Sequence, residues 1–226
     1  MFTRRGPGSP EGAGRTTRDI MGIYRKHIFP RLMDGGLSGP QHRVLRERAL
    51  ARARDAVLEI GFGTGLNLNC YPPTVERLVA LDPVVMLEAR VAGRISRAPF
   101  PVERVERDAA DPLPFRDATF DTVVSTWTLC SIERLRAAML ELRRVLRGGG
   151  SLLFLEHGRS DRKLVARFQD AVNPIQNVVA CGCNLNRRID EEIENAGFKI
   201  TELERFKVDG VPRAFGEVYQ GVAGHA

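Results

Sequence analysis

A glycine-rich segment preceded by a carboxylate offers the clearest chemistry in this 226-residue chain. Glu59 lies two residues before the first of three alternating glycines, Gly61, Gly63 and Gly65, and Phe62 lies between the first two. Glycine lets the backbone approach a ligand where a Cβ would collide. Apolar residues run directly into the loop, which predicts a buried strand, a tight turn and then a helix whose free N–H groups add donors. The segment therefore predicts a nucleotide-type binding loop.

Two acidic positions downstream fit the same ligand. Asp82 follows Gly61 by 21 residues and precedes Pro83, at the tip of the next apolar run. A carboxylate there can accept hydrogen bonds from both ribose hydroxyls. Asp108 and Ala109 follow a third run and offer an acid and a small residue for an adenine edge. The alternatives are a turn begun by Asp-Pro and plain surface charge at Asp108.

Alternating strands and helices must position these groups. The sequence predicts strands over 55–60, 77–81, 101–106, 120–125 and 151–155, and a helix over 132–147 that ends at three consecutive glycines, 148–150. Further helices are expected over 20–28, up to Pro30, over 41–54, over 163–180 with an interruption at Pro174, and after a cap at Asn186. Closing antiparallel strands are expected over 198–206 and 214–222.

In this order and spacing the chain resembles the class I S-adenosylmethionine-dependent methyltransferases. The matching segments are residues 57–65, 81–82, 108–115, 120–125 and 141–150, with Gly148 where the family usually has proline. The resemblance implies a Rossmann-like, seven-stranded, mostly parallel α/β sheet with helices on both faces and an antiparallel C-terminal strand pair. It also implies S-adenosylmethionine as cofactor, which has no phosphate and so needs no P-loop lysine. The implied cofactor-binding residues are Glu59, Gly61, Phe62, Gly63, Gly65, Asn67, Asp82, Pro83, Asp108, Ala109, Ser125 and Thr126.

A narrower resemblance reaches toward both ends of the chain. The segments are Tyr24-x₅-Pro30, Asn67-x₃-Tyr71-Pro72, residues 128–131, Glu156-His157 and residues 182–187. They resemble the methyltransferase-like subgroup that includes animal alkyl-thiol S-methyltransferases, although Asn184 stands where the subgroup often has histidine. The animal members carry a hydrophobic N-terminal anchor that this sequence lacks. The resemblance implies a small-molecule acceptor.

The acceptor side is expected at the carboxyl ends of the fourth and fifth strands. Glu156 and His157 are the candidates for general-base or acceptor-orienting work, and a solvent-facing turn histidine is the alternative. Tyr24, Trp127, Cys130, Cys183 and Arg187 are expected to line the acceptor pocket, with Trp127 and Cys130 also compatible with ordinary core positions. Cys181-x-Cys183 lacks a second Cys/His pair at metal spacing, so the sequence predicts no metal site.

The expected acceptor is a thiol or a similarly soft nucleophile. Thiols ionise at about pH 8.5, so a thiolate is available without a strong base. The alternatives are a quinone or lipid acceptor at the membrane and a cofactor-binding protein without turnover. A nicotinamide-dependent oxidoreductase is disfavoured because the glycine spacing is one residue tighter than in dinucleotide folds.

Charge and composition divide the chain into three parts. Residues 1–54 hold 12 Lys and Arg against 4 Asp and Glu, whereas the remainder holds 22 against 24. We expect a basic disordered tail over 1–18, lid helices over 19–54 and a methyltransferase domain over 55–226. The near-neutral body argues against a nucleic-acid partner, while the tail permits peripheral contact with an anionic membrane. Without a secretory leader, an apolar spanning run or a disulfide framework, the sequence predicts a cytoplasmic protein, and nothing in it specifies an oligomeric state.

Overall fold

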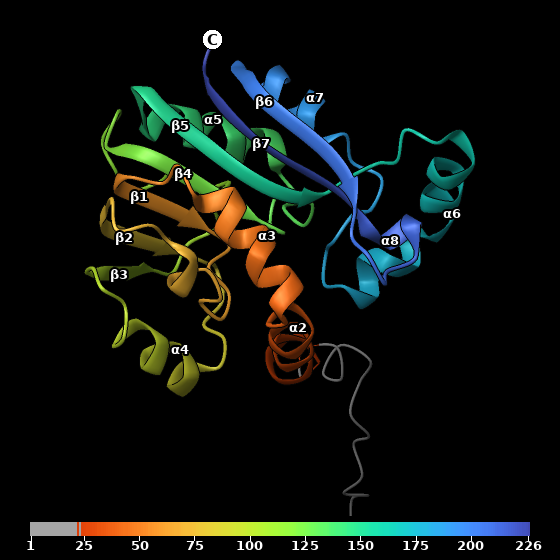
Figure 1. The fold of residues 1–226 in the computed structure, drawn as a ribbon, viewed down its shortest axis with the longest axis horizontal. Coiled ribbons are helices and arrows are strands. Elements are labelled where there is room, and N and C mark those ends of the chain that lie inside the picture. Colours follow the sequence, from red (N-terminus) through yellow and green to blue (C-terminus); the bar gives the residue numbers. More distant parts are fainter. Residues whose placement is uncertain (1–21, 23) are drawn as a thin grey trace, which may run out of the picture.

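The computed structural model describes residues 22 and 24–226, so the predicted tail over 1–18 lies outside the described residues. One seven-stranded sheet forms the centre of the fold (Figure 1). Its strands are β1 (Asp55–Ile60), β2 (Val75–Leu81), β3 (Val102–Val105), β4 (Phe120–Thr126), β5 (Leu146–His157), β6 (Phe198–Lys207) and β7 (Glu217–His225).

The strand order is β3-β2-β1-β4-β5-β7-β6. Strands β1 to β5 pair in parallel, and β7 is inserted antiparallel between β5 and β6. The predicted mostly parallel sheet with an antiparallel C-terminal pair is confirmed. Nearly every position of β1, β4 and the second half of β5 is buried, so these strands are covered on both faces, as parallel strands between helices must be.

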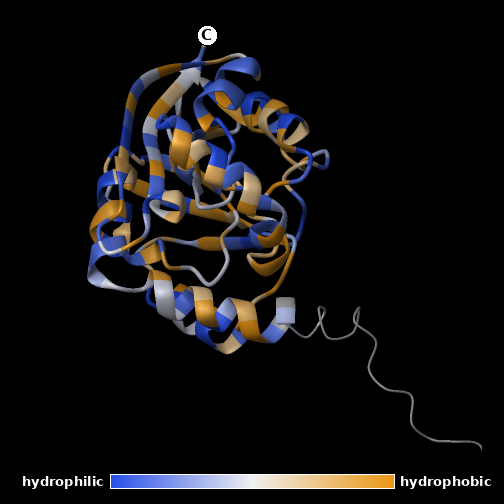
Figure 2. Cartoon of the chain, turned by 90° about the vertical axis from the view of Figure 1, so that its right-hand side faces the viewer, coloured by the Kyte–Doolittle hydropathy of each residue, from blue (hydrophilic) through white to orange (hydrophobic). Residues whose placement is uncertain are grey.

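Helices cover both faces of the sheet. The helical elements among the described residues are η1, a π-helix (Tyr24–Ile28), α2 (Phe29–Leu37), α3 (Pro40–Leu50), the 3₁₀ turn η2 (Leu68–Cys70), α4 (Glu88–Ile95), α5 (Leu135–Val145), α6 (Lys163–Val179), α7 (Ile189–Asn195) and α8 (Arg213–Gly216). Helices α3 and α4 pack with Val57 on one face, while α5 and α7 pack with Leu58 on the other. Hydrophobic residues occur on the central strands and alternate with hydrophilic ones along the surrounding helices (Figure 2).

The carboxyl ends of β1, β2 and β4 lie side by side at one edge of the sheet. Strands β2 and β3 lie on one side of β1, and β4 and β5 lie on the other. Ile60, the last residue of β1, is in register with Leu81 of β2 on one side and Ser125 of β4 on the other. The loops that leave β1, β2 and β4 therefore start side by side. This edge is where open parallel sheets bind ligands.

The structure corrects several local predictions. The glycine loop leads into only the three-residue turn η2 rather than an α-helix, because Pro72 and Pro73 follow after Tyr71 and lack the N–H groups that a helix needs. Helix α5 ends at Val145, and the glycine run 148–150 lies inside β5, where the pairing with β4 is irregular.

Two helix details also differ from expectation. Helix α6 continues through Pro174 without interruption. Helix α7 begins after Arg188 with no side-chain cap, so Asn186 does not act as the expected cap; its amide instead donates to Asp170. Among the described residues, no helix combines the length and apolar character needed to cross a bilayer.

Candidate functional site

The three loop glycines do different work. All have positive φ, at 66° for Gly61, 57° for Gly63 and 76° for Gly65. A Cβ on Gly61 would lie 2.0 Å from Oγ1 of Thr128, and one on Gly65 would lie 2.9 Å from the ring of Phe62. A Cβ on Gly63 would meet nothing closer than 3.8 Å. Gly61 and Gly65 are therefore needed for packing, whereas Gly63 leaves room at the cavity described below.

Asp82 holds the backbone of this loop in place through hydrogen bonds. One carboxylate oxygen accepts a hydrogen bond of 2.8 Å from the Gly63 N–H, and the other accepts 2.9 Å from the Val84 N–H. Burial raises the pKa of Asp82 above its usual value, and these two backbone donors oppose the rise. Each carboxylate oxygen keeps a further acceptor site. Asp82 can thus hold the loop and accept from a ligand together.

Glu59 is the centre of a buried polar network. Its carboxylate accepts 2.9 Å from Asn67 Nδ2 and 2.7 Å from the hydroxyl of Tyr71. Burial raises the pKa of Glu59 to about 7, although both hydrogen bonds favour the charged form. The group is 2% exposed. A cation placed beside it would favour the carboxylate and lower its pKa again.

Two buried polar atoms next to this network have no hydrogen-bond partner among the described residues. One is Nε of Arg46, a donor, and the other is Oδ1 of Asn67, an acceptor. Arg46 is 4% exposed, donates 2.7 Å from Nη1 to the Leu37 carbonyl and lies 4.6 Å over the Trp127 ring. Burial lowers the pKa of its guanidinium. Unsatisfied buried groups are rare and costly, so the donor on Arg46 and the acceptor on Asn67 mark two polar positions that a ligand could satisfy.

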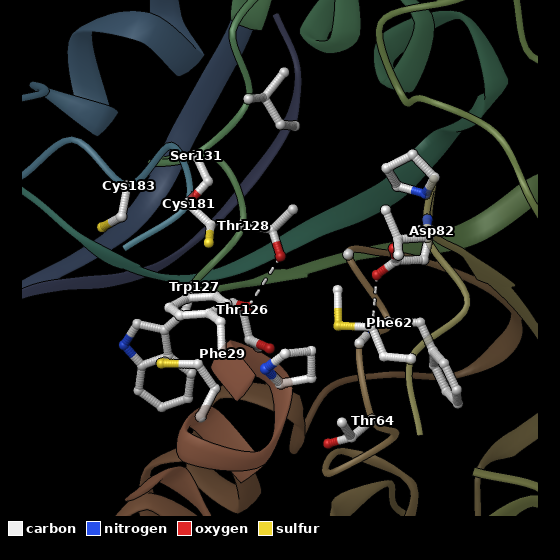
Figure 3. A pocket seen from close by; sticks show the side chains of 18 of the residues that line it. Phe29, Phe62, Thr64, Asp82, Thr126, Trp127, Thr128, Ser131, Cys181 and Cys183 are labelled. Atoms are coloured by element: carbon white, nitrogen blue, oxygen red, sulfur yellow. Dashed lines mark hydrogen bonds between the residues drawn. The ribbon is translucent and has the colours of Figure 1, made fainter. Parts of the chain in front are cut away.

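A cavity of about 890 Å³ occupies the strand edge and contains these groups. Asp82 and Phe62 lie toward one end of it, and Cys181 and Cys183 toward the other (Figure 3). The predicted site residues that line it are Glu59, Gly61, Phe62, Gly63, Asn67, Asp82, Pro83, Asp108, Ala109, Thr126, Trp127, His157 and Cys183. Helix α2 contributes an apolar wall that includes Phe29 and Met33.

Six predicted residues are not part of this lining: Tyr24, Gly65, Ser125, Cys130, Glu156 and Arg187. Glu156 is fully buried and accepts from the Ser125 hydroxyl at 2.6 Å and from the backbone N–H groups of Thr128 and Cys130. Its burial raises its pKa, against these hydrogen bonds. Glu156 therefore holds the loop after β4 rather than facing an acceptor.

The side chains of Arg187 and Tyr24 also bind backbone groups rather than facing the cavity. Arg187 donates 2.5 Å to the Leu129 carbonyl, and the Tyr24 hydroxyl donates 2.8 Å to the Val179 carbonyl at the end of α6. Both contacts join segments that border the cavity. They shape its walls without reaching its interior.

Trp127 adopts an unusual conformation beside the cavity. Its backbone φ is +50°, in a region that residues other than glycine rarely occupy. The rings of His42 and His157 lie 5.7 and 6.5 Å from it, and Arg46 covers it. Burial, and then the charge of Arg46 and the neighbouring His157, lower the pKa of His42. Strained residues cluster at functional sites, which fits the predicted place of Trp127 on the acceptor side.

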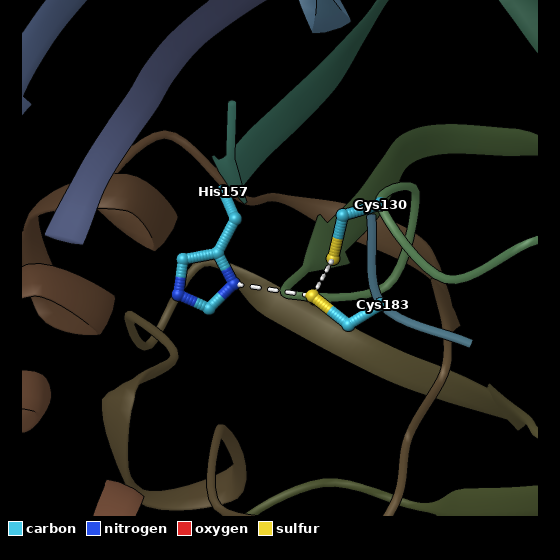
Figure 4. A group of neighbouring side chains, drawn as sticks. All are labelled: Cys130, His157 and Cys183. Atoms are coloured by element: carbon cyan, nitrogen blue, oxygen red, sulfur yellow. Dashed lines mark hydrogen bonds between the residues drawn. The ribbon is translucent and has the colours of Figure 1, made fainter. Parts of the chain in front are cut away.

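Cys130, His157 and Cys183 form a compact group that sequence spacing did not predict (Figure 4). Cys130 Sγ lies 3.6 Å from Cys183 Sγ, which lies 3.8 Å from Nδ1 of His157. The Cys130 contact lowers the pKa of Cys183 against the effect of burial, whereas the same contact and burial raise that of Cys130. The two cysteines are 53 residues apart, so no local motif joins them.

The sequence analysis also missed Asp34, Arg46 and Thr64. All three line the cavity, and Asp34 joins α2 to the glycine loop through Thr64. Arg46 lies in the predicted second helix four residues before the buried Leu50, so its place on the apolar face was a usable signal. Nothing local marked Asp34.

Comparison with known proteins gives consistent results. A family model described as a methyltransferase domain matches residues 58–154. The human thiol S-methyltransferase TMT1B is 35% identical over 158 residues, which cover 69% of this chain and 64% of TMT1B. Human thiol S-methyltransferase TMT1A is 31% identical over 166 residues, covering 72% and 68%. The match therefore spans about two thirds of the length of these relatives.

Solved structures share the fold. The N-methyltransferase NodS from Bradyrhizobium japonicum, solved with S-adenosyl-L-homocysteine, superposes with a TM-score of 0.62 at 19% identity. The superposition covers 86% of this chain and 90% of NodS. The two proteins thus share the fold.

Proposed function

Because the chain belongs to the S-adenosylmethionine-dependent methyltransferases, we propose that it methylates the sulfur of a small organic thiol. The family fixes the cofactor, and the acceptor class is our inference. Two human relatives that carry the name thiol S-methyltransferase support it. The apolar acceptor end of the cavity supports it as well.

The residues of the cavity fit the methionyl end of the cofactor. This end carries a carboxylate and an ammonium group, which match the unpaired donor of Arg46 and the unpaired acceptor of Asn67. Glu59, already bound to Asn67, would add a negative charge beside the ammonium. These opposed, unpartnered atoms are the observation that carries the cofactor placement.

The adenosine end would lie over the tip of β2. Asp82 has acceptor sites left for ribose hydroxyls, and Gly63 leaves open space next to it. Asp108 and Ala109 line the same end of the cavity. The Asp108 carboxylate accepts 2.8 Å from the Ala110 N–H, which fixes the turn there.

The opposite end suits a neutral or weakly charged acceptor. When bound, the cofactor supplies an electrophilic methyl group on a sulfonium. Phe29, Met33 and Trp127 form apolar walls that keep water from the reacting atoms. A thiolate that takes the methyl group becomes a neutral thioether, so a water-poor site favours the loss of both charges. His157 lines this end and can receive the thiol proton.

The test incubates the purified chain with labelled S-adenosylmethionine and matched series of alkyl thiols, alcohols and amines. We expect methylated thiols and no product from the alcohols or amines. Binding of adenosylhomocysteine is measured in parallel by calorimetry. Tight binding without any methylated thiol would reject the acceptor class and leave the cofactor assignment standing.

A second candidate is a hydrophobic acceptor reached at a membrane surface. Helix α6 exposes Leu164, Phe168, Ile175 and Val178, at 79%, 51%, 70% and 53%. Gln176 of the same helix lines the cavity. Flotation with anionic liposomes tests this candidate, with Ile175→Asp expected to abolish flotation. A wild-type chain that does not float would reject it.

A further inference from the structure

We propose that Cys130, His157 and Cys183 form a zinc site whose fourth coordination position opens into the cavity and takes the acceptor thiol. The inference rests on the proposed function for the identity of that fourth ligand. The three protein ligands stand on the structure alone. The three residues come from different segments. Cys130 lies in the loop after β4, His157 at the end of β5 and Cys183 in the loop after α6.

The distances within the group fit tetrahedral zinc. With Zn–S at about 2.3 Å and Zn–N at about 2.0 Å, tetrahedral angles place two sulfurs about 3.8 Å apart and a sulfur and a nitrogen about 3.5 Å apart. The observed separations are 3.6 Å for Cys130 Sγ to Cys183 Sγ and 3.8 Å for Cys183 Sγ to His157 Nδ1. All three ligand atoms lie within 4.8 Å of one another. On zinc binding, the third separation, between Cys130 Sγ and the imidazole nitrogen, would have to be about 3.5 Å.

The backbone holds the two cysteine segments together before any ion binds. Asn184 donates to the Cys130 carbonyl from both its backbone N–H, at 2.9 Å, and its side-chain amide, at 3.0 Å. Glu156 accepts the Cys130 N–H at 3.3 Å. A Cβ on Gly182 would lie 3.0 Å from the Ser131 carbonyl oxygen, so glycine permits this close approach. Such outer contacts orient metal ligands in known sites.

The group is closed on the protein side and open on the cavity side. Cys130 is 1% exposed and stands behind the wall, while Cys183 and His157 line the cavity. Three protein ligands with one open position are typical of catalytic zinc, including Cys₂His sets. Two thiolates balance the charge of Zn²⁺, and a neutral imidazole completes the set. Zinc therefore suits these donors better than the oxygen-seeking Mg²⁺ or Ca²⁺.

Zinc would prepare the acceptor in a balanced sequence. With His157 bound to the ion, water takes its place as the proton acceptor: the thiol gives its proton to water as its sulfur binds the ion in the open position. A sulfur electron pair then forms the new S–CH₃ bond, and the bond between the methyl carbon and the sulfonium sulfur breaks. That electron pair stays on the former sulfonium, which becomes a neutral thioether. The methylated acceptor is also neutral and leaves the ion more readily than a thiolate does.

Metal binding is tested first, without reference to turnover. The full chain is treated with chelator, freed of it and titrated with Zn²⁺ or Co²⁺. We expect one ion per chain and, with Co²⁺, thiolate-to-metal charge-transfer absorption. Cys130→Ser, Cys183→Ser and His157→Ala should each weaken binding at least about tenfold. Cys70→Ser and Cys181→Ser are the matched controls and should bind as wild type.

Several results would overturn the site. They are no stoichiometric binding by the wild-type chain, or loss of the ion in Cys181→Ser but not in Cys130→Ser. Circular dichroism and Tm show whether each variant is folded. The chelated wild-type chain provides a metal-free reference that needs no substitution. Its far-ultraviolet spectrum should match that of the metal-bound chain.

The fourth position is tested by adding propanethiol to the cobalt-loaded chain, with propanol as control. We expect the thiol alone to change the charge-transfer spectrum, and an unchanged spectrum would overturn the inference. Equal methyl transfer by metal-free and zinc-loaded chains would do so too, while leaving the proposed function intact. Conversely, a chain that binds zinc and thiol but forms no methylated product would defeat the proposed function and not the site.

Discussion

Asp34 in α2 accepts a hydrogen bond of 2.6 Å from Oγ1 of Thr64 in the glycine loop. Arg94 of α4 donates 2.5 Å to the same carboxylate and 2.6 Å to the Thr64 carbonyl, and Arg90 also pairs with it. Burial raises the pKa of Asp34, but the hydrogen bonds from Arg94, Thr64 and Arg90 outweigh burial and bring it to about 2. Hydrogen bonds and ion pairs of Asp34 thereby connect helix α2 to the glycine loop, which would hold the cofactor.

We expect Asp34→Ala to lower both stability and cofactor affinity. Arg94 would be left largely buried without its partner, and the loss should be about 2–4 kcal/mol in the free energy of unfolding. Adenosylhomocysteine should bind roughly tenfold more weakly because the glycine loop loses its fastening. Urea unfolding and calorimetry measure the two effects. Glu47→Ala, which breaks the exposed Arg43–Glu47 pair, is the control and should cost less than about 1 kcal/mol.

The pH dependence supplies a further check on Asp34. Its folded pKa lies below the ordinary 3.8, so its contribution is complete above that pH and is lost as the pH falls toward 2. The stability gap between wild type and Asp34→Ala should narrow over that interval. A gap that stays constant down to about pH 2 would contradict the assignment.

Substitution of the loop glycines should separate packing from ligand binding. Gly61→Ala places a methyl group on Thr128 and should destabilise the fold by several kcal/mol. Gly63→Ala meets no close neighbour, so its stability cost should be only the roughly 1–2 kcal/mol of a positive φ. Its larger effect should be on adenosylhomocysteine affinity, measured by calorimetry. Equal loss of Tm with unchanged affinity in both variants would refute this division.

Sequence reasoning recovered those features of the fold that local patterns encode. Apolar runs ending in Glu59 and Asp82 predicted two strands and an edge where their acids meet, and both acids line the cavity. The helix after the glycine loop was wrong, because the pair of prolines ends the turn at Cys70. The two prolines are visible in the sequence and are a local signal for this ending.

The rest depends on contacts between distant segments. Thr64 meets Asp34 from 30 residues away, and Cys183 meets Cys130 from 53 residues away. No periodicity or spacing encodes such pairs, because tertiary packing alone brings them together. Glu156 illustrates the reverse case, since its position at a strand end indicated an acid–base role while the fold turns its carboxylate toward backbone N–H groups.

Glu59→Gln should stabilise the cofactor-free chain at neutral and higher pH. The pKa of Glu59 is about 7 in the folded chain against 4.5 in the unfolded chain, so the folded state holds the proton more tightly. The contribution of Glu59 to the free energy of unfolding is therefore lost as the pH rises from 4.5 to 7. The glutamine side chain does not titrate, so the Glu59→Gln variant does not lose stability in this way. The free energy of unfolding of the variant, relative to that of the wild type, should rise by on the order of 3 kcal/mol between about pH 5 and about pH 8. Urea unfolding across this range measures it, and a pH-independent difference would be evidence against a buried, titrating Glu59.

If Arg46 binds the carboxylate of the cofactor, its substitution should weaken a ligand that carries this carboxylate and leave a ligand without it unaffected. Arg46→Met keeps the apolar packing on Trp127 but removes the cation, so a ligand carboxylate loses its partner. Adenosylhomocysteine, which carries the carboxylate, should bind roughly 10- to 100-fold more weakly, as expected for a hydrogen bond to a charged group. Methylthioadenosine, which lacks the amino-acid group, should bind wild type and variant equally.

Calorimetry with both ligands measures the Arg46 effect, and Tm confirms that the variant is folded. Arg43→Met is the matched control, because Arg43 lies on the same helix but its side chain is 64% exposed. It should leave both affinities unchanged. If Arg46→Met weakened the two ligands by the same factor, the guanidinium would act on the shape of the cavity rather than on the carboxylate, and the methionyl group would have to lie elsewhere.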